Sequence, residues 1–210
     1  MIFSIELQKI IAFMVVLVFS VVFHEVSHGW VAYKLGDPTA KQLGRLTLNP
    51  LPHIDPMGTI LVPLFIFFAS RGTMCFGAAK PVPINIYNLK NPRRDMMWIG
   101  ASGPLSNILL AVSASLILKI LPSTNNFLGL ILYIAVLINL ILASVNLIPL
   151  PPLDGSRILA GLLPRDLAIQ YDRLERWGFP ILIGLYFLGF LQPIVGAIYT
   201  FLRAVLGFAI

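Results

Sequence analysis

The chain has 210 residues, of which 58% are hydrophobic and 11% are charged, and its formal net charge is +6. A soluble domain carries about 25% charged residues, so this composition excludes an ordinary soluble protein and predicts one membrane-embedded domain over residues 1–210. The positive charge fits basic loops beside an anionic membrane, and no basic stretch interleaved with aromatic residues indicates a nucleic-acid partner. The single cysteine, Cys75, excludes an internal disulfide.

An apolar run predicts a first helix over about residues 3–35. Residues 10–23 contain no charged side chain, and Gly36-Asp37-Pro38 is typical of a helix end. The start of the chain has neither a strongly basic region nor a small-residue cleavage site. We therefore expect the first helix to be retained rather than removed as a signal peptide.

This helix carries the motif His24-Glu25-Val26-Ser27-His28. On a helix His24 and His28 point to one face, so both imidazoles can reach one zinc ion. Glu25 could then take a proton from a water molecule at the metal. A purely structural role for the three residues is the alternative, but ionisable side chains in a membrane segment are costly and usually functional. The motif predicts a hydrolytic zinc site in apolar surroundings.

Three less regular segments follow. Residues 39–55 contain Gly44, Pro50 and Pro52, and they are too broken for a helix, so we predict short strands or an irregular loop at the rim of the site. Residues 57–70 are apolar but too few to cross a full bilayer in one straight helix, which favours a re-entrant segment or a short span. Residues 71–94 are polar and rich in proline and glycine, which is typical of a loop.

Two clear spans come next, at residues 96–118 and 127–145, and the prolines after Asn146 then break the chain before Asp154. We predict a short helix over residues 156–163, a charged surface segment over 165–176, and an apolar segment over 177–210. Gln192-Pro193 interrupts that last segment, which is then either one kinked span or a span followed by an interfacial helix. The predicted fold is an all-α polytopic membrane protein with about four to six transmembrane or re-entrant helices and a short irregular or β segment near the active site.

A catalytic zinc ion usually has three protein ligands and one open position, and two residues are candidates for the third ligand. Asp154 is favoured because an acidic side chain at membrane depth needs a cation. His53 would complete a set of three histidines, which is also a known zinc site. Asp154 could instead cap the helix that follows it, although capping by one oxygen does not exclude metal binding by the other.

Three motifs, in this order, resemble the site-2 protease family of intramembrane zinc metalloproteases, in its compact prokaryotic branch without an added regulatory domain. They are His24-Glu25-x-x-His28, Gly103-Pro104 and Asn146-x-x-Pro149-x-x-Pro152-Leu153-Asp154-Gly155. The resemblance implies one zinc ion per chain, bound by His24, His28 and Asp154, with Glu25 as the general base. It also implies that Asn146 lies near the scissile carbonyl, although Asn146 could equally bond a backbone carbonyl freed near Pro149.

The function that the resemblance implies is hydrolysis of peptide bonds in the transmembrane segments of membrane-anchored proteins. The partners would be those substrates and the lipid bilayer, in a prokaryotic cell membrane, and the sequence leaves the oligomeric state open. A membrane transporter or sensor that binds metal without proteolysis is the alternative, but it would need polar residues along a pathway. A catalytically silent chaperone of membrane helices would be expected to lack part of the motif, and this chain has all of it.

Overall fold

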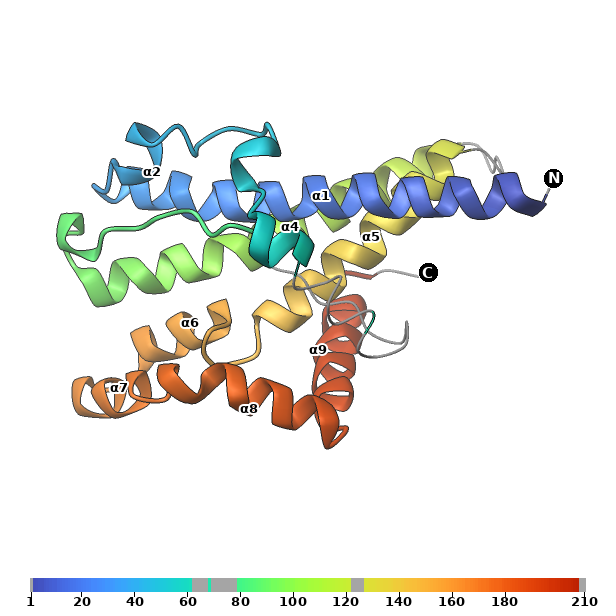
Figure 1. The fold of residues 1–210 in the computed structure, drawn as a ribbon. Helices are drawn as coiled ribbons and strands as arrows, with labels where there is room; N and C mark the ends of the chain where they lie inside the picture. Colours follow the sequence, from blue (N-terminus) through green and yellow to red (C-terminus); the bar gives the residue numbers. More distant parts are fainter. Residues whose placement is uncertain (1, 62–67, 69–78, 122–126, 208–210) are drawn as a thin grey trace.

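The computed structural model describes residues 2–61, 68, 79–121 and 127–207, and these residues form helices and connecting turns with no β-strand among them. Three of the helices are long and apolar enough to cross a membrane, namely α1 (Ile2–Lys34), α4 (Pro92–Ile120) and α5 (Phe127–Asn146). The α1 and α4 helices run alongside each other, and α5 crosses them obliquely (Figure 1). The prediction of an all-α membrane protein is confirmed.

The α1 helix ends close to the predicted position because Gly36 adopts a left-handed conformation, with φ of +114°. The backbone N–H of Asp37 donates to the Ala32 carbonyl at 2.9 Å, and the N–H of Gly36 donates to the Tyr33 carbonyl at 3.2 Å. This pair of bonds satisfies two carbonyls at the helix end, and glycine adopts the required conformation without a steric penalty.

The buried carboxylate of Asp37 organises the turn that follows. It accepts hydrogen bonds from Thr39, from the backbone N–H of Asn85 at 2.7 Å and from Asn88 Nδ2 at 2.8 Å. Burial raises the pKa of Asp37, but these hydrogen bonds outweigh burial and hold the pKa below its usual range. The carboxylate is therefore ionised at neutral pH and ties the end of α1 to a segment almost fifty residues later.

The prediction of strands within residues 39–55 is wrong. The described backbone there forms two short helical turns, α2 (Thr39–Gln42) and the 3-10 helix η1 (Leu51–His53). The bonds from Thr39 to Asp37 start the first turn, and Pro52 fits within the second because a proline is tolerated in a first helical turn. The irregular character predicted near the site is confirmed, but its backbone is not extended.

Only part of the next two predicted segments lies within the described residues. The π-helix η2 (Pro56–Leu61) covers the start of the apolar segment 57–70. Most of the rest of that segment lies outside the described residues. The described part of the loop runs from residue 79 through the 3-10 helix η3 (Ile86–Asn88), but α4 begins at Pro92, earlier than predicted. Proline suits a first helical position, and Asp95 accepts a hydrogen bond from the Asn91 N–H at 2.9 Å.

After α5 the chain forms α6 (Asp154–Leu162), α7 (Arg165–Asp172), α8 (Glu175–Phe187) and α9 (Leu191–Val205). The α8 and α9 helices meet at 91°, so together they form a broken span or a re-entrant pair (Figure 1). The break lies at Gly189, with φ of +75°, and not at Gln192-Pro193 as predicted. Pro193 falls in the first turn of α9, where a missing N–H leaves no helical bond unmade.

The α4 helix is the centre of the fold, since it contacts α1, α5 and α6. Small buried residues line its contact with α5 and allow the two backbones to approach closely. The core there consists of Ala111, Ala114, Val136, Leu140, Ala143 and, from α9, Leu202. This packing fixes α4 between the helix that carries the His-Glu-x-x-His motif and the helix that begins with Asp154.

Candidate active site

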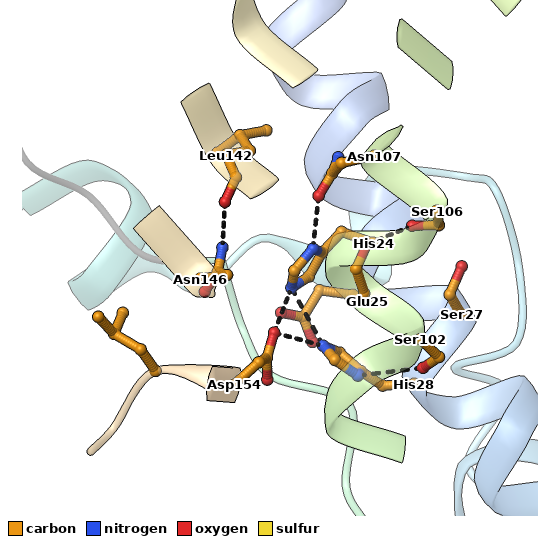
Figure 2. Close-up of polar contacts among 12 residues, drawn as sticks. His24, Glu25, Ser27, His28, Ser102, Ser106, Asn107, Leu142, Asn146 and Asp154 are labelled. Carbon is orange, nitrogen blue, oxygen red and sulfur yellow. Dashed lines mark hydrogen bonds and ion pairs between the residues drawn. The ribbon is translucent and has the colours of Figure 1, made fainter. Parts of the chain in front are cut away.

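Three buried side chains converge where α1, α4 and α6 meet. The Nε2 atoms of His24 and His28 are 3.0 Å apart, and Asp154 Oδ2 lies 3.0 Å from the first and 3.1 Å from the second. Each of the three residues is at most 7% exposed. Figure 2 shows the two imidazoles and the carboxylate pointing toward one another. The structure thus brings together three residues that the sequence suggested as metal ligands.

The α4 helix can pack against this histidine pair because position 103 is a glycine. A Cβ atom added to Gly103 would lie 2.5 Å from both His24 Cε1 and His28 Nε2, far closer than real Cβ contacts allow. Glycine therefore lets the backbone of α4 form one wall of the cluster. The side chains of His24 and His28 fill the space that any larger residue would occupy.

The donor atoms in this cluster fit a zinc ion. His28 Nδ1 lies 2.6 Å from the Ile99 carbonyl, which can only accept, so the proton is on Nδ1 and Nε2 offers a lone pair. His24 Nδ1 likewise faces the side-chain oxygen of Asn107 at 2.7 Å. Asp154 Oδ2 is buried and has no hydrogen-bond partner among the described residues. Two nitrogen lone pairs and one carboxylate oxygen meet at one point, an arrangement that a bound cation stabilises.

Asp154 reaches the cluster because a tight turn precedes α6. A Cβ atom at Gly155 would lie 2.4 Å from the Ile148 carbonyl oxygen, so glycine is required for this turn. The N-cap residue of α6 is Leu153 and Asp154 is the first helical residue, which argues against the capping alternative.

Glu25 follows the first histidine, and its carboxylate is close enough to His24 for an electrostatic interaction. Glu25 Oε2 accepts a hydrogen bond from the backbone N–H of Val82 at 2.9 Å. The buried guanidinium of Arg45 donates to the Lys80 carbonyl at 2.7 Å and so fixes the segment that contains Val82. Glu25 is held in place by the main chain beside the cluster.

The other two candidate residues lie outside the cluster. His53 is buried in η1, and its Nε2 lies 3.0 Å from the Thr47 carbonyl oxygen, so the structure does not bring it to His24 and His28. Asn146 is the last residue of α5, and its Nδ2 donates to the Leu142 carbonyl at 3.0 Å (Figure 2). That carbonyl belongs to the same helix and precedes Pro149 by two turns, so the bond near Pro149 considered above is not formed.

The contacts of Asn107 and Val82 with the site residues are among those that were not predicted from the sequence. Asn107 contacts His24 from α4, and its side chain, the one amide in that span, is the signal that could have revealed it. Val82 contacts Glu25 through its backbone N–H, and no pattern in the sequence reports such a contact.

Comparisons with known proteins agree with a metal-dependent hydrolase. Residues 121–188 match the family model described as Peptidase family M50. A Bacillus subtilis protein named "Putative zinc metalloprotease YwhC" is 38% identical over 180 residues, which are 82% of this chain and 78% of that protein. "Putative zinc metalloprotease Rip2" of Mycolicibacterium smegmatis is 28% identical over 78% of this chain and 62% of its own length. "Zinc metalloprotease MJ0392" of Methanocaldococcus jannaschii is 27% identical over 72% of this chain and 34% of its own length. No solved structure matches.

Proposed function

This chain belongs to peptidase family M50 and is a zinc metalloprotease, and from that premise we propose that it hydrolyses peptide bonds inside the membrane-spanning segments of other proteins. One observation carries the proposal. Two of the three clustered residues, His24 and His28, lie on α1, a helix long and apolar enough to cross a membrane. A hydrolytic site on such a helix lies at the depth of segments that cross the bilayer.

The proposed metal ligands are His24 Nε2, His28 Nε2 and Asp154 Oδ2, a set of two nitrogens and one oxygen that leaves a fourth position open. Zinc held there would supply Lewis acidity, which makes water acidic enough to lose a proton near neutral pH and polarises a peptide carbonyl. The three side chains are at most 7% exposed, so bulk water has little access to them.

Glu25 is the proposed general base. Its carboxylate takes a proton from the attacking water and later gives that proton to the leaving amine. The Val82 N–H engages Oε2 and so orients the carboxylate while leaving Oε1 for proton transfer. The substrate helix must unwind before attack, because its carbonyls are otherwise occupied by helical hydrogen bonds.

Asn146 is proposed to donate a hydrogen bond to the oxygen of the scissile carbonyl as charge develops on it. One hydrogen of its Nδ2 is used by Leu142, and the second is available to a substrate. We expect Asn146→Leu to lower kcat/KM by about 10²–10³-fold, the usual effect of losing one such donor. The loss should lie in kcat, with unchanged zinc content. Activity within about twofold of the wild type, measured as fragment release at several substrate concentrations, would argue against this role.

The proposed function is tested with zinc-loaded protein and a single-span substrate in liposomes. We expect fragments whose new ends, located by mass spectrometry, fall inside the apolar segment of the substrate. Removal of zinc with a chelator should reduce cleavage to the uncatalysed background, and added zinc should restore it. New ends confined to the polar flanks of the substrate, or cleavage that survives complete removal of zinc, would contradict the proposal.

A further inference from the structure

A chain of buried polar side chains leads away from His24 into the centre of the helix bundle. His24 Nδ1 contacts Asn107 Oδ1 at 2.7 Å, and Asn107 Nδ2 donates to Asn139 Oδ1 at 2.8 Å. Asn139 Nδ2 in turn donates to Ser20 Oγ at 2.9 Å and to the Ala135 carbonyl at 2.8 Å. Both asparagines are at most 1% exposed. The chain joins α1, α4 and α5 at a depth where water cannot replace a lost partner.

Two backbone carbonyls set the direction of the bonds in this chain, that of Ala135 through Asn139 and that of Ser20, which lies 3.4 Å from Asn107 Nδ2. A carbonyl can only accept, so the Asn139 amide must present its NH₂ group to Ala135 and its oxygen to Asn107. Asn107 must then present its own NH₂ group to Asn139 and its oxygen to His24. Turning both amides over would place the Asn139 oxygen against the Ala135 oxygen at 2.8 Å, where two acceptors repel.

The proton of a neutral imidazole can be on either nitrogen. Since the Asn107 oxygen can only accept, the His24 proton is held on Nδ1 and the lone pair on Nε2 points at Asp154 and His28. His28 achieves the same state through the Ile99 backbone carbonyl, which no side-chain substitution can remove. His24 depends instead on two side chains.

We propose that Asn107 and Asn139 are positioning residues that keep the His24 proton on Nδ1 and thereby leave Nε2 free to bind zinc. The proposal rests on the role of His24 as a zinc ligand. Asn139 acts through Asn107, since it reaches the imidazole only by fixing the direction of the Asn107 amide. Partners of metal-bound histidines commonly change metal affinity by about 10–100-fold when replaced.

The test compares zinc affinity in Asn107→Leu and Asn139→Leu, measured by competition with a fluorescent chelator. Asn107→Leu should bind zinc about 10–100-fold more weakly than the wild type. Asn139→Leu should also bind zinc more weakly but lose less affinity, because the Ser20 carbonyl still accepts from Asn107 Nδ2. Ser144→Ala is the matched control, because Ser144 is also a buried polar residue of α5 but bonds only the Leu140 carbonyl of its own helix. Its zinc affinity should be unchanged. Asn107→Asp keeps an acceptor toward His24 but places an oxygen against Asn139 Oδ1, so its zinc affinity should lie between those of the wild type and Asn107→Leu.

A second measurement separates positioning from packing. The ¹⁵N spectrum of histidine-labelled, zinc-loaded protein reports whether the Nδ1–H of His24 is hydrogen-bonded, and three histidines make assignment practicable. We expect a hydrogen-bonded Nδ1–H for His24 in the wild type and a weaker hydrogen bond in Asn139→Leu. If Asn139→Leu does not fold, Asn107→Asp answers the same question, since a carboxylate accepts the Nδ1–H whichever way it is turned.

Unchanged zinc affinity in both leucine variants, or a His24 Nδ1–H without a hydrogen bond in the zinc-loaded wild type or Asn107→Asp, would overturn the proposal. These outcomes are distinct from failure of the proposed function, which would appear as absence of cleavage or of zinc in the wild type itself.

Discussion

Replacing Glu25 with glutamine is expected to lower cleavage by about 10²–10⁴-fold, the usual contribution of a general base, while zinc content stays the same. Glutamine has the same shape, and its side-chain oxygen can still accept the Val82 N–H. It cannot take a proton from water near neutral pH, so proton transfer is lost and the architecture of the site is kept. Fragment release in liposomes and metal analysis of the same sample measure the two effects together.

Glu6→Gln is the matched control for that substitution. Glu6 lies on the same helix but is exposed, and its contact is with Lys9 rather than with the cluster. Its removal should leave both cleavage and zinc content unchanged. If Glu25→Gln kept more than about a tenth of wild-type cleavage, Glu25 would not be the general base. If it lost zinc as well, Glu25 would be contributing to metal binding.

The second large effect is expected for Gly103→Ala. The added methyl carbon would lie 2.5 Å from His24 Cε1 and from His28 Nε2, which is far shorter than a van der Waals contact. The imidazoles or α4 must therefore move. A displacement of about 1 Å in such a site costs about 10²-fold in rate. We expect cleavage to fall at least that far and zinc to be lost from the purified protein. Metal analysis and a cleavage assay measure both.

Gly196→Ala provides the control for adding a methyl group to a helical glycine. Gly196 lies in α9, and no described atom outside its own helix comes within 4 Å of a Cβ added there. Alanine is also the better helix former, so this variant should be as stable and as active as the wild type or slightly more stable. A folded Gly103→Ala variant with full zinc and full activity would show that α4 does not pack on the histidine pair as described.

The sequence predicted family membership, the metalloprotease activity and zinc, and all three are confirmed. They were predictable from the motifs that contain His24, Glu25, His28 and Asp154, whose residue types and spacing indicate their chemistry. The roles of the individual residues stay predictions. The ends of α1 and α5 were also predictable, since Gly36 and the prolines after Asn146 act on their immediate neighbours.

What the sequence could not predict depends on contacts between distant residues. The turns at residues 39–55 are stabilised partly by Asp37, whose other partners include Asn85, 48 residues away. Gly103 allows a close helix approach, but nothing local identifies the histidine pair as the group that approaches. At the α8–α9 bend, Gly189 and Pro193 are both possible breaks, and only the folded backbone, with its positive φ at Gly189, shows that the glycine is the one used.

The order of the zinc-binding residues along the chain also bears on how the protein is made. His24 and His28 leave the ribosome with α1, whereas Asp154 follows α5, the last of the described helices that could each cross a membrane alone. During synthesis, the nascent chain therefore holds the proposed general base and two proposed ligands before the carboxylate of the third proposed ligand is made. On this ligand set, hydrolysis would begin only after α5 has been made and α6 has docked beside α4.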